Sequence, residues 1–173
     1  MGKEVSIFQG DITTIKVDVI VNAANRSLLG GGGVDGAIHK AAGPELLEAT
    51  KKLGGANTGE AKITAGYNLP TDYVIHTVGP IYRDGTHNEA SLLQASYENS
   101  LALAEEYQLE SIAFSAISTG IYGFPIEEAT DIAVSTIKNN LDKLESVKQI
   151  IFVVFNEEIK EVYENYIETY QLN

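Results

Sequence analysis

The spacing of apolar residues changes repeatedly along the chain between a strand repeat and a helix repeat. Alternating or continuous β-branched runs predict strands over residues 5–9, 17–22, 61–67, 73–77, 111–117 and 147–155. Helical spacing predicts helices over residues 34–42, 45–53, 89–107, 125–140 and 156–170. Strands that alternate with helices are typical of an α/β sandwich with a largely parallel sheet. No linker or repeat interrupts this pattern, so we expect residues 1–173 to form one domain.

Two glycine-rich segments each join a predicted strand to a predicted helix. Residues 30–36 read GGGGVDG, and residues 118–125 read STGIYGFP. Sheets of this class bind ligands outside the carboxyl ends of their strands. Bare backbone that enters a helix N-terminus offers free N–H groups to an anion. Each loop alone could be an ordinary turn, but together they favour a site that holds a diphosphate from two sides.

Composition and charge limit what this ligand and its site can be. The 173 residues include no cysteine, which excludes disulfides, thiolate metal sites and cysteine nucleophiles. The net charge of -12 disfavours DNA and RNA binding, and an anion would have to be held by backbone N–H groups. Three histidines without clustering make a metal site unfavourable, and no cofactor is expected. The N-terminus lacks an apolar signal region and no run is long enough to span a membrane, so we expect a cytoplasmic protein.

Three familiar glycine or serine motifs do not fit. Gly31, Gly33 and Gly36 match G-x-G-x-x-G, but residues 22–29 separate them from the preceding strand. The acidic residue that a dinucleotide site requires at the next strand end is also missing, which disfavours an NAD site. No G-K-[ST] follows the glycines, and no G-x-S-x-G occurs in the chain.

Five blocks of sequence, in order along the chain, resemble the macrodomain family and its MacroD-like branch. They are GDI at residues 10–12, VIVNAAN at 19–25, GGGGVDGAIHKAAG at 30–43, HTVGP at 76–80 and AISTGIYGFP at 116–125. The resemblance implies a three-layer α/β/α fold with a central mixed, largely parallel sheet. It also implies that the protein binds ADP-ribose and its esters.

The resemblance assigns each part of the ligand to a part of the chain. Asp11, beside Ile12, accepts a hydrogen bond from the adenine amino group, and Phe155 lies against the ring. Asn25 contacts the distal ribose. The backbone of two loops wraps the diphosphate and distal ribose; its residues are Gly32, Gly33 and Val34 in the first loop and Ser118, Thr119, Gly120, Ile121 and Tyr122 in the second.

MacroD-like proteins are similar in removing ADP-ribose from acidic protein side chains and in deacetylating O-acetyl-ADP-ribose. The resemblance associates this hydrolase activity with Asn25 and Asp35, which are both present, and predicts mono-ADP-ribosylated proteins as partners. Two alternatives stay open: a reader that binds ADP-ribose without turnover, and a phosphatase acting on ADP-ribose-1″-phosphate. The chain departs from many relatives at Ser115, where proline is common, and at Phe124, where tyrosine is common.

The key residues also have simpler interpretations. Asp35 could serve only to favour the dipole of its helix. Asn25 could be a turn residue that binds local backbone groups, and Asp11 could cap a short turn. His39 lies one turn beyond Asp35 and either pairs with it or packs in the core. We expect His76, at a strand end, to be structural.

Overall fold

The computed structural model describes residues 2–172, and its centre is a sheet of six strands. The order across the sheet is β1-β6-β5-β2-β4-β3, and only β3 runs antiparallel to its neighbour. The strands are β1 (Glu4–Gln9), β2 (Val19–Ala23), β3 (Ala61–Ala65), β4 (Tyr73–Thr77), β5 (Ser111–Phe114) and β6 (Gln149–Val154). The predicted mixed, largely parallel sheet is therefore confirmed.

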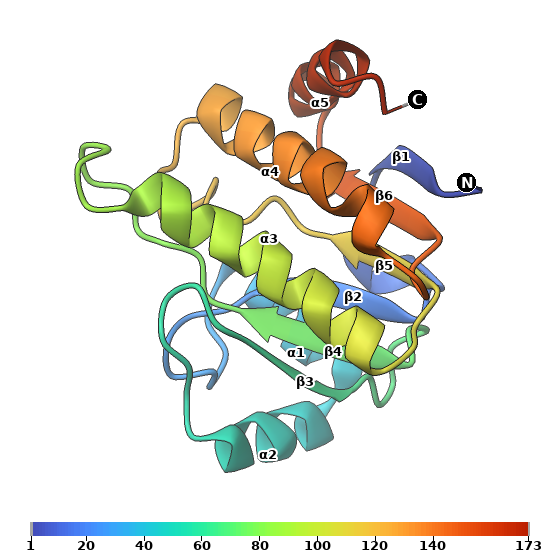
Figure 1. Ribbon diagram of the computed structural model, residues 1–173. Helices are drawn as coiled ribbons and strands as arrows, with labels where there is room; N and C mark the ends of the chain where they lie inside the picture. The colour runs from blue at the N-terminus through green and yellow to red at the C-terminus, as the bar shows by residue number, and fades with distance from the viewer. Residues whose placement is uncertain (1, 173) are drawn as a thin grey trace.

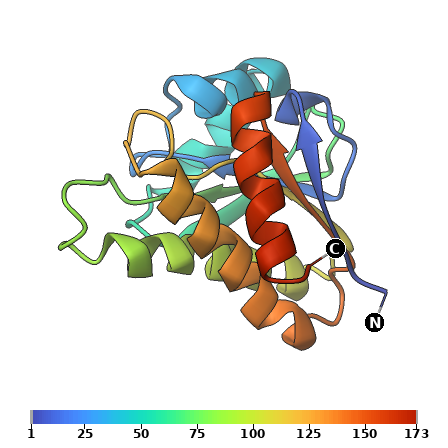
Figure 2. The same cartoon turned by 90° about the horizontal axis from the view of Figure 1, so that it is seen from above.

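Helices cover both faces of this sheet and complete three layers (Figures 1 and 2). They are α1 (Gly33–Ala42), α2 (Pro44–Leu53), α3 (Glu89–Glu106), α4 (Ile126–Asn140) and α5 (Glu157–Thr169). Helices α3, α4 and α5 lie on one face, and α1 with α2 lies on the other. There are also two short 3-10 helices: Ile12–Thr14 is the short turn that Asp11 could cap, and Leu141–Lys143 was not anticipated.

Alternation along the strands divides the core between the two faces. In β2, Val19 and Val21 point to the layer of α3, α4 and α5, while Ile20 between them points to α1. Phe114 and Phe152 pack together on the first face, with ring centroids 6.1 Å apart. All these side chains are buried, and the central strands β2, β5 and β6 contribute apolar residues to both faces, as a covered parallel sheet requires.

All the predicted strands and helices are present, but several end earlier than expected. The strand expected to reach residue 67 ends at Ala65, because Gly66 N–H turns back to Asp72 O. The strand expected to reach residue 117 ends at Phe114, where the chain leaves the sheet. Asn156 caps α5 by accepting from the N–H of Ile159.

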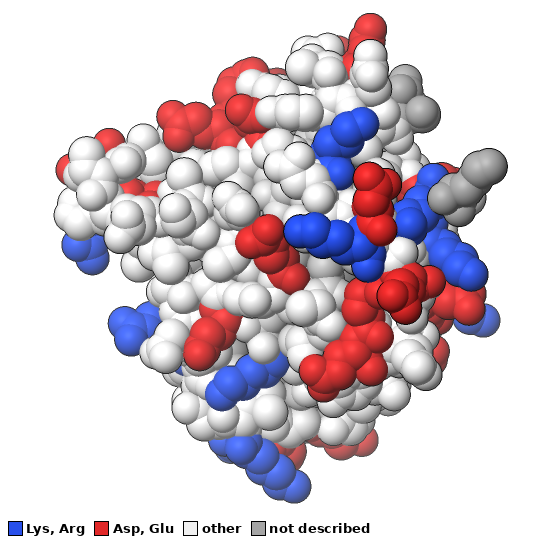
Figure 3. Space-filling model, in the orientation of Figure 1, with Lys and Arg blue, Asp and Glu red and all other residues white. Residues whose placement is uncertain are grey.

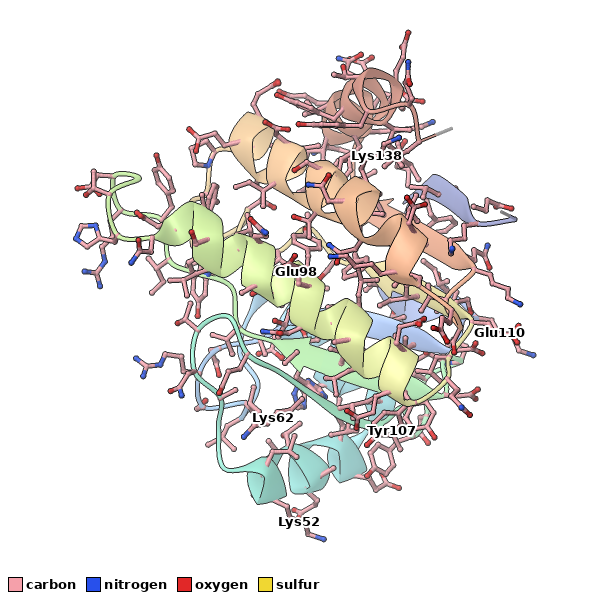
Figure 4. All side chains as sticks on the ribbon, in the orientation of Figure 1. Lys52, Lys62, Glu98, Tyr107, Glu110 and Lys138 are labelled. Atoms are coloured by element: carbon pink, nitrogen blue, oxygen red, sulfur yellow. The ribbon has the colours of Figure 1, made fainter. Side chains whose placement is uncertain are left out.

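Surface side chains add little to the choice of a binding face. On the face drawn in Figure 3, acidic and basic side chains are interspersed. Lys62 of β3, labelled in Figure 4, donates to the carbonyls of Leu53 and Gly55 and so caps the carboxyl end of α2. Within residues 2–172, no helix has the length and apolar character that crossing a membrane requires.

Candidate functional site

A cleft of about 790 Å³ opens at the carboxyl ends of the parallel strands. The segments that line it directly follow β1, β2, β4, β5 and β6, together with the first turns of α1. Strands that run in the same direction bring their carboxyl ends to one edge, which is where open α/β sheets bind ligands. The site is therefore a direct consequence of the parallel topology.

Every residue that the sequence predicted for the site lines this one cleft. They are Asp11, Ile12, Asn25, Gly32, Gly33, Val34, Asp35, Ser118, Thr119, Gly120, Ile121, Tyr122 and Phe155. Segments separated by more than a hundred positions in the sequence thus meet at one place. Their individual ligand contacts stay predictions.

The charge of the cleft determines what can bind an anion there. Its only charged side chains are the carboxylates of Asp11 and Asp35, and no described residue of the lining is a lysine or arginine. An anionic ligand would therefore depend on backbone N–H groups and on the N-terminus of α1. This is the arrangement expected from the glycine loops and the acidic composition.

The first glycine loop needs its glycines for two different reasons. Gly33, the first residue of α1, has φ +58°, a conformation that disfavours a branched side chain. A Cβ on Gly36 would overlap the carbonyl oxygen of Gly31, so the loop can fold back onto its helix only because Gly36 has none. A Cβ on Gly31 would lie 3.2 Å from Asn25 Nδ2 and 3.4 Å from Asp35 Oδ2. Asn25 and Asp35 therefore face the same small space beside Gly31.

Asp35 is a nearly buried carboxylate, 5% exposed, in the first turn of α1. Its Oδ1 accepts a hydrogen bond of 2.8 Å from Asn22 Nδ2 and lies 3.5 Å from His39 Nε2. Burial raises the pKa of Asp35, while the Asn22 hydrogen bond and the His39 charge oppose that shift. No described residue donates to Oδ2, which faces Gly31 and is free to accept a proton from water.

Asn25 makes the local backbone contacts that the simpler interpretation requires. Its Nδ2 donates to Gly30 O at 2.8 Å, and its Oδ1 accepts from Ser27 Oγ and Leu28 N–H. These bonds fix the side chain and hold the start of the glycine loop. One Nδ2 hydrogen has no acceptor among the described residues and is the part of Asn25 that can donate to a ligand.

The other end of the cleft carries Asp11 and Phe155. Asp11 caps the 3-10 helix Ile12–Thr14, with Oδ1 accepting from the N–H and the hydroxyl of Thr13. The predicted cap is confirmed, and it uses one of the two carboxylate oxygens. The ring of Phe155 is 73% exposed at the end of β6, so one face is free to stack against a base.

The second glycine loop is held in an unusual backbone conformation. Ser118 is buried with φ +66°, and a Cβ on Gly79 would overlap its hydroxyl. The Ser118 carbonyl is fixed in turn, since it accepts from the N–H of Phe124 at 2.9 Å. Tyr82 N–H donates to Tyr122 O at 2.8 Å and ties the loop to the segment after β4.

The two departures from the family pattern have clear structural settings. Ser115 Oγ donates to Val21 O at 2.7 Å and so extends the contact between β5 and β2 past the end of β5. Phe124 is buried against Tyr82, with ring centroids 4.9 Å apart, and is not part of the cleft lining. Neither substitution changes a residue predicted to touch the ligand.

Sequence reasoning missed two polar residues that lie behind Asp35. They are Asn22 and Thr64, which flank the fully buried His76. A signal was available, because Asn22 follows Ile20 at the two-residue spacing of a buried strand face. A polar residue in such a row must find partners inside the protein.

One group of possible metal ligands lies outside the cleft. Asp84, His87 and Glu89 bring one ligand atom each within 4.8 Å of one another. Glu89, however, accepts from the backbone N–H groups of Arg83, Asp84, Gly85 and His87, which occupy both carboxylate oxygens. This cluster is therefore explained as a loop anchor.

Comparison with known proteins gives one consistent family. The Macro domain family model matches residues 21–133. The chain is 55% identical to the O-acetyl-ADP-ribose deacetylase of Escherichia fergusonii, covering 94% of each protein. It is also 55% identical to the ADP-ribose glycohydrolase MACROD2 of Xenopus laevis, covering 90% of this chain and 38% of that protein. A mutant of the Oceanobacillus iheyensis macrodomain with ADPR superposes with a TM-score of 0.90 at 45% identity, over 94% of this chain and 91% of that one.

Proposed function

This chain belongs to the macrodomain family, and from that premise we propose that it is an ADP-ribose-binding hydrolase. It removes ADP-ribose from acidic side chains of proteins and deacetylates O-acetyl-ADP-ribose. The names of two relatives that are each 55% identical to it support both activities. A solved structural neighbour that contains ADPR supports the ligand.

The observation that carries the proposal is the position of Asp35. Its Oδ2 has no donor among the described residues and lies beside Gly31, at the glycine loop that would hold the diphosphate and distal ribose. Its raised pKa makes it a stronger base than an exposed aspartate. A site built only for binding would not need a partly satisfied buried carboxylate at this point.

The chemistry common to both substrates is ester hydrolysis. Asp35 Oδ2 accepts a proton from a water molecule as the water oxygen attacks the carbonyl carbon of the ester. The tetrahedral intermediate then breaks its bond to the ribose oxygen, which receives the proton. The products are a carboxylic acid and ADP-ribose with a free hydroxyl, and Asp35 is again ionised. Asn25 donates a hydrogen bond to the distal ribose and orients it toward the water.

The test is to measure acetate release from O-acetyl-ADP-ribose and ADP-ribose binding in the same preparation. The proposal expects release well above the uncatalysed rate. Tight ADP-ribose binding without release would identify a reader instead. Phosphate release from ADP-ribose-1″-phosphate without acetate release would identify the phosphatase alternative.

The linkage that the protein hydrolyses is tested with modified peptides. Peptides linked to ADP-ribose through Asp or Glu should be hydrolysed, and peptides linked through Ser or Arg should not. The reason is that Asp35 can promote attack on a carboxylic ester more readily than cleavage of a glycosidic bond to a serine oxygen or to an arginine guanidinium nitrogen. The cytoplasmic location and the absence of nucleic-acid partners stay predictions from the sequence.

A further inference from the structure

Three neighbouring strands place a row of buried polar side chains beneath α1. Asn22 of β2 pairs directly with His76 of β4, and Thr64 lies on the adjoining β3. Their alternation puts all three on the face of the sheet that carries α1, in register with Ile20 and Val74. Asn22 and His76 are 0% exposed and Thr64 is 9% exposed. The row ends at the carboxylate of Asp35.

The hydrogen bonds along this row have one consistent direction. Thr64 Oγ1 donates to Ala65 O at 3.1 Å, so its single proton is used and it can only accept from His76 Nε2, 3.0 Å away. His76 Nε2 therefore carries the ring proton and Nδ1 is bare. Nδ1 then accepts from Asn22 Nδ2 at 3.2 Å, and the second hydrogen of Nδ2 goes to Asp35 Oδ1 at 2.8 Å.

The hydrogen bonds along this row determine the orientation of the Asn22 amide. Asn22 Oδ1 is buried without a partner among the described residues, so the amide is not oriented to satisfy its oxygen. A bare His76 Nδ1 requires a donor, which places Nδ2 between the imidazole and Asp35. A proton on Nδ1 would instead attract Oδ1, and turning the amide would bring an oxygen against the Asp35 carboxylate.

We propose that His76 and Thr64 are positioning residues for the reaction, which act through the Asn22 amide to keep a hydrogen-bond donor on Asp35. The inference rests on the proposed function, because it assigns these residues to the chemistry of Asp35. None of the three lines the cleft itself, and only Asn22 contacts a lining residue, Asp35. The titratable side chains that contact Asp35 are His39 on α1 and, through Asn22, His76 on β4.

The environment of His76 keeps its ring neutral, as this arrangement needs. Burial lowers the pKa of His76 to about 3, and the charge of His39 adds to the effect, with the two ring centroids 6.3 Å apart. The imidazole therefore does not gain a second proton at pH values near neutrality. Its tautomer is then set by its two hydrogen-bond partners, Thr64 at Nε2 and Asn22 at Nδ1.

The decisive variant is Thr64→Val, which keeps the shape of the side chain and removes its hydroxyl. It frees His76 to move its proton to Nδ1 and so to turn the Asn22 amide. We expect kcat on O-acetyl-ADP-ribose to fall about fivefold, the value of one net hydrogen bond, with KM unchanged. The acid limb of the kcat profile should move to higher pH, because Asp35 loses a donor that favours its charged form.

A matched control separates this effect from loss of a buried hydroxyl. Thr50 of α2 is also fully buried, and its hydroxyl donates only to Leu47 O. Thr50→Val should leave kcat and the pH profile unchanged. If Thr64→Val changes thermal stability but leaves kcat and the acid limb at their wild-type values, the role of Thr64 is only structural and the inference is wrong.

Substitutions of His76 sharpen the test. His76→Leu removes the acceptor for Asn22 and should lower kcat roughly tenfold, the upper value of one net hydrogen bond. His76→Asn places an oxygen near the position of Nδ1 and should restore kcat to within about threefold of wild type, by the value of the bond it restores. Equal losses in the two variants would contradict the proposal.

The tautomer can be measured without any substrate. Long-range ¹H–¹⁵N spectra of the wild-type protein should show His76 with a bare Nδ1 and a protonated Nε2, and a proton on Nδ1 would overturn the inference. This readout does not depend on turnover. A wild-type protein that releases no acetate would therefore refute the proposed function, while the spectrum would still decide the direction of the hydrogen bonds.

Discussion

Asp35 and Glu89 are acidic residues in the first turns of α1 and α3, and both are nearly buried, but the protein satisfies them very differently. Glu89 accepts from four backbone N–H groups of the loop before its helix. Asp35 accepts one hydrogen bond, from Asn22, and contacts His39. The number of donors, and not the position in the helix, separates a structural carboxylate from a reactive one.

The two carboxyl groups also shift in opposite directions. Burial alone would raise the pKa of Glu89, but hydrogen bonds from the backbone of Arg83, His87 and Gly85 outweigh it and lower that pKa to about 2. Burial raises the pKa of Asp35, and its single donor does not reverse the effect. The ionised form of Glu89 thus stabilises the folded state. The ionised form of Asp35 destabilises the folded state, but it is the form that can accept a proton from water.

The largest expected effect is on catalysis at Asp35. Asp35→Ala should lower kcat on O-acetyl-ADP-ribose by roughly 10²–10⁴-fold, the usual contribution of a general base. ADP-ribose affinity, measured by calorimetry, should hold or improve, because a negative charge near the diphosphate is removed. If a ligand phosphate shares the role of base, the loss of kcat should fall at the low end of this range.

Two outcomes distinguish the catalytic role of Asp35 from the role of Asn25. Asn25→Ala should lower both kcat and affinity, because this residue also holds the loop and the ground-state ribose. Wild-type turnover by Asp35→Ala on both O-acetyl-ADP-ribose and a glutamate-linked peptide would remove Asp35 from the mechanism. His39, which lies 3.5 Å from it, would then be the next candidate.

The Asp11 carboxylate is intermediate between those of Asp35 and Glu89 in the number of its donors. One of its oxygens accepts from Thr13, and no described residue donates to the other. Asp11→Ala should weaken ADP-ribose binding about 10–100-fold, which corresponds to losing a hydrogen bond to a charged group. The loss should be smaller for a ligand without the adenine amino group. Thr13→Val, which removes only a capping partner, is the control and should bind normally. Equal losses for both ligands would remove Asp11 from adenine recognition.

Glu89 should affect stability and not chemistry. Glu89→Gln places an amide NH₂ among N–H donors and should lower Tm by several degrees, with kcat within about twofold of wild type because Glu89 lies outside the cleft. The deficit should be largest above pH 4.5, shrink as the pH falls through the folded pKa of about 2, and disappear below it, where the wild-type carboxyl is protonated in both states. Glu164→Gln, at an exposed position of α5, is the control. An unchanged Tm would mean that the four N–H bonds do not stabilise the loop.

The sequence predicted the fold well because the pattern along the strands is strong. Each strand and helix follows from local periodicity, and the parallel order brings the two glycine loops to one edge. The ends of several elements were wrong, as at Ala65 and Phe114, and the 3-10 helix Leu141–Lys143 was missed. Those ends depend on hydrogen bonds between distant residues, such as Ser115 Oγ to Val21 O, which periodicity does not encode.

The candidate site was predicted residue by residue, but its electrostatics were not. A diphosphate bound beside Asp35 would raise the pKa of that carboxyl by like-charge repulsion. In the structure, burial already raises that pKa. The partners Asn22, His76 and Thr64 come from three strands, and their juxtaposition follows from the register of β2, β4 and β3. Register is a tertiary property, so no local motif could reveal the row behind Asp35.

The smallest expected effect is on stability, and it has the opposite sign to that of Glu89. Asp35→Asn keeps the shape of the side chain and the acceptor for Asn22 but removes the buried charge. Because the pKa of Asp35 is raised in the folded state, the folded protein binds its proton more tightly than the unfolded chain does. Above the folded pKa both states are ionised, and the folded state carries the full cost of the buried charge. Asp35→Asn should therefore raise Tm slightly at pH 7, even though the variant loses turnover.

As the pH falls through the folded pKa to below 3.8, the wild-type carboxyl becomes protonated and the difference should vanish. Thermal scans at several pH values measure this, with Asp142→Asn, at an exposed position, as a control for net charge. A lower Tm for Asp35→Asn at pH 7 would show that the helix dipole and Asn22 outweigh burial, and the contrast with Glu89 would then be one of degree and not of sign.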